Sequence, residues 1–401
     1  MRKLLVLLSA VALMVAFTVP AIAADKSVSF YGRVWMDTFI EDDSKEKTGT
    51  SFDDSDLFWN LEANGTSRFG ANFKWDSMSA NIEIRPWSAS VYRQWWGAWN
   101  FGSGSLLVGH TWSPLYINTA ICGQCEGGGS GGQLGGWVGD LRRAQIRLTM
   151  GGLTVALVEP STNVSVDPYT AASTTITTPA AAAIADPSGN WSLITVLGGG
   201  YNLYGIPSSG TKTEFDTTLP KVEVTYALKL GSIGLVPFLG WQSYDEVDVS
   251  NDKSYSIDGM VYGITARVPV GPGYVNAQVW MSKNDANWGN LYHNGFGGAK
   301  LSGSSIKDED RMGYALVAGM MLSDTMKFEV GYGHNEYELD LPGTWEDTSS
   351  LYYAQLEIKL AKGFTVTPEF GKVDDDEQKT PSGVKKEGDM TYYGAVWKIH
   401  F

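Results

Sequence analysis

The chain has 401 residues, of which 43% are hydrophobic and 18% are charged, and it contains 47 glycines. This composition excludes a disordered chain, a coiled coil and a helical repeat array. The formal net charge of −14 argues against nucleic acid as a partner, because phosphate binding needs a basic surface. The mean hydropathy of −0.13 excludes a helical membrane protein but leaves a membrane barrel open, since polar and apolar residues alternate in a barrel.

Residues 1–23 are predicted to form a cleaved secretory signal peptide. Arg2 and Lys3 precede an apolar run at 4–19, and Ala21-Ile22-Ala23 has the small-residue pattern of a cleavage site. The run is shorter than the roughly 20 residues of a spanning helix, so an uncleaved anchor is the less favoured alternative. No later stretch has 18 consecutive apolar residues, which leaves the periplasm, the outside or the outer membrane as destinations.

From residue 24 onwards, the chain alternates between apolar and polar residues with period two. In segment 57–75, for example, Leu57, Trp59 and Phe69 share one parity, while Glu62, Arg68 and Lys74 share the other. Successive side chains of a strand point to opposite faces, so 57–75 is predicted to be one long two-faced strand. Similar segments predict sixteen strands, near 28–39, 57–75, 79–87, 91–101, 105–113, 141–150, 153–160, 218–230, 233–245, 257–270, 274–284, 309–323, 326–338, 348–361, 364–373 and 389–401.

Short turns alternate with long polar loops, which is the asymmetry of an outer-membrane barrel. The long loops are expected at 40–56, 114–140, 162–217, 246–256, 285–307, 339–347 and 374–388. An extra hairpin within 162–217 would give eighteen strands. A soluble all-β protein also alternates, but inward Lys, Glu and Arg cannot fill a dry core, and a ring of sixteen strands encloses water. The sequence therefore predicts an all-β, transmembrane antiparallel β-barrel over 24–401.

Both ends of the chain and the region around its third loop carry recognisable motifs. They are Phe30-Tyr31-Gly32-Arg33, Thr66-Ser67-Arg68-Phe69-Gly70, Arg93-Gln94-Trp95-Trp96-Gly97, Ser113-Pro114-Leu115-Tyr116, Arg142-Arg143-Ala144-Gln145-Ile146-Arg147 and the alternating terminal Tyr393, Trp397, Ile399 and Phe401. The last set resembles the C-terminal assembly signal of outer-membrane proteins. Together the motifs resemble the general porins of Gram-negative bacteria, in detail over 28–155.

The resemblance implies a homotrimer of 16-stranded channels in the cell outer membrane, each narrowed by a third loop, 114–140, inserted into its lumen. It also implies contacts with outer-membrane lipid, with lipopolysaccharide and with the outer-membrane assembly machinery. The solutes would be small and hydrophilic, and no cofactor is expected.

Parity predicts which charged side chains line the lumen. It points Arg33, Arg68, Arg143, Arg147, Glu83 and Arg85 inward. Arg93 shares its parity with the apolar Trp95 and Trp99, so its inward position follows from the resemblance alone. In the family, such arginines face acidic residues of the inserted loop. We therefore expect a pore constriction formed by Arg33, Arg68, Arg93, Arg143, Arg147 and Glu126.

The third loop departs from the family pattern. It contains only Glu126 and Asp140 as acids and is rich in glycine from 127 to 136, and His110 stands where many members have arginine. The strength of the transverse field, the ion selectivity and the pore radius are therefore not determined by the sequence.

Cys122 and Cys125 are predicted to form a local disulfide, because an exported chain meets an oxidising compartment. No His follows Cys125 for haem attachment, and no second Cys pair completes a zinc site. The acidic stretch 374–377 lacks the spacing of a calcium loop and is predicted to be a solvated external loop, so no metal site is expected. The glycine run at 127–132 matches two catalytic motifs trivially, and no catalytic residue is expected.

The sequence thus predicts a passive diffusion channel for small hydrophilic solutes and ions that is not an enzyme. Two alternatives are a substrate-selective channel and a surface adhesion or phage-receptor barrel acting through 162–217. A barrel enzyme is a third, but the chain's four histidines show no evident serine partner.

Overall fold

A computed structural model describes most of the chain after the predicted signal peptide. The described residues are 26–49, 53–60, 67–85, 92–119, 137–138, 142–161, 213–217, 219–248, 253–288, 298–302, 305–341, 343 and 345–401. The predicted signal peptide, the predicted Cys122–Cys125 disulfide, Glu126 and nearly all of loop 162–217 lie outside these residues.

The described chain is built almost entirely of strands. They are β1 (Ser27–Asp43), β2 (Asp54–Asn60), β3 (Arg68–Trp75), β4 (Met78–Ile84), β5 (Tyr92–Asn100), β6 (Gly104–Trp112), β7 (Ile117–Asn118), β8 (Trp137–Val138), β9 (Arg142–Met150), β10 (Leu153–Val158), β11 (Thr213–Asp216), β12 (Lys221–Tyr226), β13 (Leu228–Leu230), β14 (Ile233–Asp248), β15 (Lys253–Val270), β16 (Gly273–Lys283), β17 (Lys300–Ser302), β18 (Ser305–Lys307), β19 (Glu309–Ser323), β20 (Met326–Leu339), β21 (Glu346–Ala361), β22 (Phe364–Thr380) and β23 (Gly383–His400). Two short helices, α2 (Lys45–Thr48) and α4 (Asp285–Trp288), lie between strands. Neither helix is long and apolar enough to span a membrane, and no other helix is found in the part of the chain described here.

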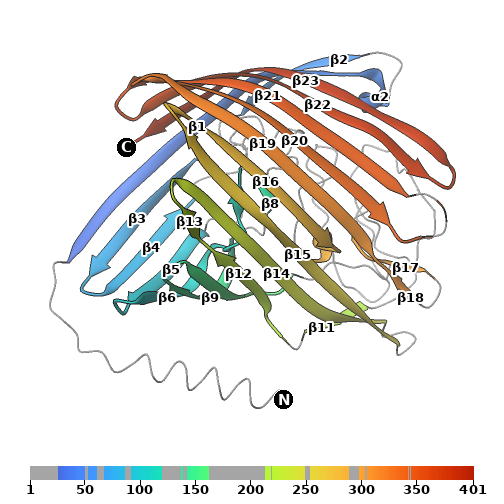
Figure 1. Cartoon of the computed structure of the whole chain (residues 1–401), viewed down its shortest axis with the longest axis horizontal. Helices are drawn as coiled ribbons and strands as arrows, with labels where there is room; N and C mark the ends of the chain where they lie inside the picture. The colour runs from blue at the N-terminus through green and yellow to red at the C-terminus, as the bar shows by residue number, and fades with distance from the viewer. Residues whose placement is uncertain are drawn as a thin grey trace, which may run out of the picture.

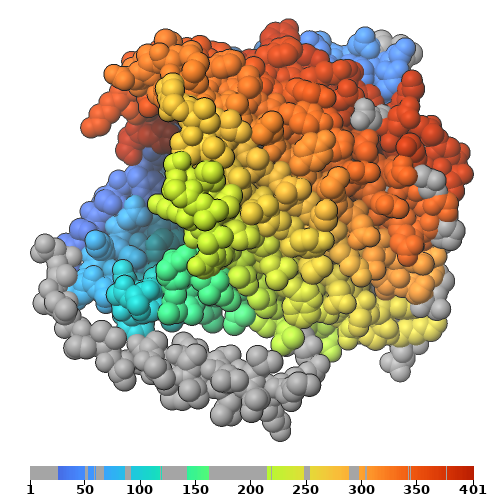
Figure 2. Space-filling view, viewed as in Figure 1, coloured from blue at the N-terminus to red at the C-terminus, as the bar shows by residue number. Residues whose placement is uncertain are grey.

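Nineteen of the strands form one antiparallel sheet that closes into a barrel, because β1 pairs with β23 on one side and with β2 and β3 on the other. β2 and β3 follow one another along β1, and β11, β12 and β13 follow one another along β14. The barrel therefore has sixteen strand positions, as the sequence predicts. Figure 1 shows the tilted strands of the barrel, and Figure 2 shows their side chains packed together on the face turned to the viewer.

The predicted strand 57–75 is interrupted, which corrects the expectation of one continuous strand. Asp37 lies opposite Asn60, whereas Arg33 lies opposite Arg68, so the pairing register along β1 shifts by four residues between β2 and β3. A shift of four residues is even, so β2 and β3 keep the same faces, and the side chain of Trp59 is 66% exposed on the outside. Ser67 anchors the point where pairing resumes, because its Oγ accepts the Trp35 N–H at 2.9 Å.

Two predicted loops, 246–256 and 374–388, are wrong because the strands beside them continue. β14 and β15 leave only residues 249–252 between them, and β22 and β23 are joined by a turn after Thr380. The extensions carry charged residues on both faces, such as the adjacent Lys385 and Lys386 of β23. Where a strand extends beyond the apolar layer, both of its faces are polar. Alternation of apolar and polar residues therefore cannot reveal such an extension.

The two faces of the barrel differ as parity predicts. On β21, Tyr352 is 50% exposed on the outer face, while the adjacent Tyr353 is 5% exposed on the inner face. The outer face carries the large exposed apolar side chains, among them Phe30, Val108, Ile146, Leu316, Phe370 and Trp397. A continuous apolar outer surface is what a hydrocarbon layer requires.

The inner face is less uniformly polar than the sequence predicts. One sector of it carries a buried apolar cluster, formed by Trp35, Phe39, Val317, Leu351, Tyr353, Val373, Met390, Tyr392 and Val396. Phe39 meets Tyr392 edge to face at 5.9 Å between ring centroids. The same strands also carry buried acids, since Asp347 lies on β21 with Leu351 and Glu369 lies on β22 with Val373.

The closing seam depends on a glycine. The Gly32 N–H donates to the Phe401 carbonyl at 2.8 Å, and the Phe401 N–H donates back to Gly32 at 3.1 Å. The Phe401 ring lies over Gly32 and leaves no room for a Cβ atom.

A Gly32→Ala variant is expected to lower the thermal stability of the barrel by about 1–3 kcal/mol, the usual cost of overpacking. The added methyl must displace the Phe401 ring and loosen the seam. Thermal unfolding in detergent, followed by gel mobility, measures the effect. Gly234→Ala in β14 is the control, since a Cβ there meets nothing within 4 Å; equal melting of the two variants would contradict the role of the seam.

Candidate pore constriction

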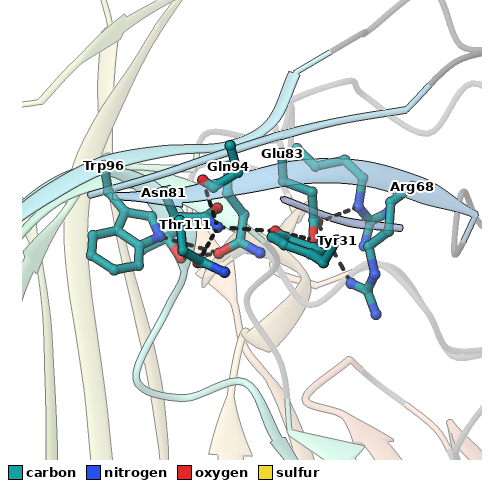
Figure 3. Close-up of polar contacts among 10 residues, drawn as sticks. Tyr31, Arg68, Asn81, Glu83, Gln94, Trp96 and Thr111 are labelled. Atoms are coloured by element: carbon teal, nitrogen blue, oxygen red, sulfur yellow. Dashed lines mark hydrogen bonds and ion pairs between the residues drawn. The ribbon is translucent and has the colours of Figure 1, made fainter. Parts of the chain in front are cut away.

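A buried carboxylate, Glu83 on β4, organises the inner wall formed by β1, β3, β4 and β5. Its Oε1 accepts a hydrogen bond from Arg93 Nε at 2.8 Å and lies 3.5 Å from Arg68 Nη1. Its Oε2 accepts the Tyr31 hydroxyl at 2.9 Å. Figure 3 shows Tyr31 and Arg68 converging on Glu83 from neighbouring strands. One acid thus holds two of the predicted constriction arginines.

A β-bulge directs Arg93 inward. Ile84 lies opposite Tyr92 while Glu83 lies opposite Gln94, so Arg93 is an extra residue in β5. A bulge shifts the alternation of its strand by one. The side chain of Arg93 is therefore buried beside Glu83, whereas Trp95 is 55% exposed on the outer face. Simple alternation puts both on one face and is wrong here, while the family resemblance places Arg93 correctly.

A polar network extends from Glu83 along the wall (Figure 3). The Asn81 side-chain amide donates to the Tyr31 hydroxyl at 2.9 Å. Further along, Gln94 Oε1 accepts the Thr111 hydroxyl at 2.8 Å and Trp96 Nε1 at 3.3 Å. Because each side chain holds its neighbour, the wall presents its charges in fixed positions.

Arg147 on β9 holds the start of the third loop. Its Nε donates to Gln145 Oε1 at 3.0 Å, and its Nη2 donates to the Trp112 carbonyl. Gln145 Nε2 in turn donates to the Thr111 and Trp112 carbonyls at 2.8 and 3.1 Å. These backbone carbonyls belong to the end of β6, so Arg147 fixes the point at which the chain leaves the sheet.

Arg142, which the sequence analysis did not select, joins the arginine group. Its guanidinium lies 4.1 Å from the centroid of the Trp112 ring, and Trp112 stacks on Tyr116 at 3.8 Å. The charges of Arg85, Arg93 and Glu83 all act on it. Arg142 is the first residue of β9, where the regular strand begins, so parity does not describe its direction.

The other selected residues lie on the same side of the barrel. Arg33 is directly opposite Arg68 in the pairing of β1 with β3, and its guanidinium lies 4.5 Å from the Trp35 ring centroid. Arg143 follows Arg142 on β9 and is half-buried. Glu126 lies outside the described residues.

The third loop begins by entering the lumen. Leu115 is fully buried, and its N–H donates to Glu223 Oε2 on β12 at 3.0 Å. Thr119 Oγ1 donates to Gln278 Oε1 on β16 at 2.6 Å. The segment 113–119 therefore leaves β6 and contacts the inner faces of β12 and β16, as an inserted loop must.

A second segment, α4, also packs inside the barrel, although 285–307 was expected to be external. Trp288 is fully buried and contacts Leu115, and a Cβ on Gly240 would lie only 2.7 Å from its ring. The Lys221 ammonium lies 4.5 Å from this ring centroid and donates to the Trp288 carbonyl at 2.9 Å. Trp288 is a large apolar residue in an otherwise polar stretch, and this is the sequence signal that could have indicated a buried position.

No group of three or more metal-ligating side chains occurs among the described residues. In the acidic stretch 374–377, Asp375 is buried and pairs with Lys47 of α2. The Asp375 carboxylate is therefore engaged in an ion pair within the protein.

A closed barrel with an apolar outer surface, a polar inner wall and a loop folded into its lumen defines an outer-membrane channel. The sequence matches the Gram-negative porin family over residues 10–378, and the chain belongs to that family. It is an outer-membrane channel for small solutes.

Solved structures share the fold at low sequence identity. The outer-membrane channel DcaP of Acinetobacter baumannii is 14% identical with a TM-score of 0.61, over 96% of this chain and 100% of that one. An anion-selective porin from Comamonas acidovorans is 11% identical with a TM-score of 0.53, over 94% and 100%. OmpT of Vibrio cholerae is 13% identical with a TM-score of 0.51, over 95% and 100%. No curated protein sequence matches this chain.

Proposed function

We propose that this channel conducts small hydrophilic solutes and ions by passive diffusion and catalyses no reaction. The observation that carries the proposal is the fixed charged wall around Glu83, beside the start of the inserted loop. Charges held in place at a narrow point orient dipolar solutes and set ion preference without forming bonds.

We further propose that the constriction comprises Arg33, Arg68, Arg93, Arg143, Arg147 and the loop acid Glu126. Their roles differ with exposure. The Arg68 side chain is 20% exposed and is suited to meet solutes, whereas that of Arg93 is 3% exposed and holds Glu83. Arg147 holds the start of the third loop. We add Glu83 and Arg142 to the proposed constriction residues.

Arg68→Ala is expected to shift the reversal potential in a KCl gradient towards cation preference, because a lumen-facing positive charge is lost beside Glu83. Purified protein in a planar bilayer, with ohmic conductance in the wild type, gives the measurement. Lys74→Ala is the matched control, because Lys74 lies on the same face of β3 near its far end. The same shift in both variants would assign selectivity to overall charge, and absent wild-type conductance would refute the channel.

We also propose that the protein is a homotrimer in contact with outer-membrane lipid and lipopolysaccharide. The outward Tyr393, Trp397, Ile399 and Phe401 are available to the assembly machinery, since each is at least 38% exposed in the monomer. Sedimentation in mild detergent tests the trimer, and a monomeric mass in conducting preparations would contradict it.

A further inference from the structure

A pocket lies at the rim of the barrel, between α2 and the adjoining ends of β21, β22 and β23. Its volume is about 490 Å³. Figure 1 shows α2 at the end of the barrel away from the C-terminus, which is the external end because the short turns of such barrels face the periplasm. The acidic side chains that line the pocket are Glu46, Glu346, Asp374, Asp375, Glu377 and Asp389.

Hydrogen bonds and an ion pair fix one side of this rim pocket. Ser44, just before α2, accepts the Asp389 N–H on its Oγ at 2.9 Å and donates its own N–H to the Asp389 carbonyl at 2.9 Å. Lys47 of α2 pairs with Asp375 of β22. Gly388 permits this close approach, since a Cβ there would collide with Ser44 Oγ. The helix is therefore clamped to β22 and β23, and the rim pocket is preformed.

The surroundings of the rim pocket are strongly acidic. The segments 43–56, 346–347 and 372–389 together contain thirteen acidic residues and six lysines. Some of the lysines are already engaged, as Lys379 is by Glu346 at 2.8 Å. The lysines offset fewer than half of the acids, so the remaining negative charge attracts cations to this end of the barrel.

Two buried carboxylate oxygens at the rim pocket lack a donor. Asp375 lines the pocket with a side chain that is 3% exposed, and its Oδ1 has no hydrogen-bond partner among the described residues. Asp43 Oδ1 is also buried without a partner in this part of the structure, and the charges of Lys47 and Asp375 act on it. Buried polar atoms are paired in most proteins, because an unmet hydrogen bond is costly. Lys47 alone does not satisfy these carboxylates, which leaves a place for a second cationic donor.

We infer that the rim pocket binds a small organic cation that carries two ammonium groups, one on Asp375 and the other on the exposed acids Glu46 and Glu377. No group of three or more metal-ligating side chains occurs among the described residues, which disfavours a bare metal ion. Separated carboxylates instead match ammonium groups spaced along a chain, each of which offers three donors for charge-assisted hydrogen bonds. The inference goes beyond the proposed diffusion function, because binding at the rim does not require conduction.

The test is isothermal titration of the purified protein in detergent at low salt with putrescine, a four-carbon chain with an ammonium group at each end. Saturable binding is expected. Glu46→Gln and Glu377→Gln should each raise the Kd several-fold, and Asp375→Asn should raise it about tenfold, because each removes a charge-assisted contact. Butylamine, which carries a single ammonium group, should bind about tenfold more weakly than putrescine to the wild type.

Asp340→Asn is the matched control. It removes the same charge at the same end of the barrel, where Asp340 follows β20 and pairs with Lys307 outside the rim pocket, and it should leave the Kd unchanged. Equal weakening in this control overturns the site, because it would assign binding to overall charge. A wild type without saturable binding overturns it too, as does a magnesium ion or butylamine that binds as tightly as putrescine.

Glu46 and Glu377 are exposed, so their variants test the rim pocket even where Asp375→Asn displaces α2. Unchanged binding in both of these variants overturns the site. A protein that conducts but does not bind putrescine refutes the rim site alone, whereas one that binds putrescine but does not conduct refutes the channel alone.

Discussion

Trp288→Ala is expected to produce channels with larger current fluctuations and a lower melting temperature than wild type. Trp288 is fully buried between the third loop and the opposite wall, in contact with Leu115 and under the Lys221 ammonium. Truncating a buried aromatic side chain costs about 3–5 kcal/mol. The truncation would leave a cavity where α4 supports the third loop. The third loop would therefore move more inside the lumen. Single-channel recording and thermal unfolding measure the two effects.

Trp59→Ala is the control for this variant, because Trp59 is 66% exposed on the outer face of β2. It removes the same side chain without touching the lumen, and current fluctuations should match the wild type. Wild-type noise in Trp288→Ala, in a preparation that melts earlier, would mean that α4 stabilises the barrel but does not hold the loop.

Glu83→Gln is expected to destabilise the barrel and to shift selectivity towards anions, opposite in sign to Arg68→Ala. The substitution leaves Arg68 and Arg93 without their shared negative charge inside the wall. Breaking a buried ion pair by removing one partner costs about 3–5 kcal/mol. Thermal unfolding gives the first effect, and the reversal potential in a KCl gradient gives the second.

Glu357→Gln is the comparison, since that acid lies 3.6 Å from Lys327 with its side chain 30% exposed. Partly exposed pairs contribute about 0–1 kcal/mol, so this variant should melt close to the wild type. Adding Arg93→Met to Glu83→Gln should recover part of the lost stability, because it removes one of the uncompensated charges. Unchanged melting of Glu83→Gln would show that the Glu83 cluster is not structural.

The strand boundaries show where sequence reasoning stops. Alternation identifies a strand only while one face meets an apolar layer and the other meets water. It therefore locates the sixteen strands but misses the polar extensions of β22 and β23. Alternation does not predict the break between β2 and β3, because the register shifts there by an even number of residues. The apolar side chains of both strands therefore stay on the outer face.

The site shows the same limit in finer detail. The sequence selects Arg33, Arg68 and Arg147 as inward from parity, and the inner wall contains them. The sequence does not identify Glu83 as the centre of the site, although parity points its side chain inward. It also misses Arg142, because one residue at a strand end has no alternation to follow.

The sequence by itself determined the all-β class, the ring of sixteen strands and which face of most strands meets lipid, because these follow from a local period of two and from turn lengths. Only the tertiary structure decided that Arg93 turns inward at a bulge, that α4 and Trp288 support the third loop and that Glu83 gathers its arginines. These features depend on register between strands and on contacts between residues far apart in the chain, such as Leu115 with Glu223, which no local pattern records.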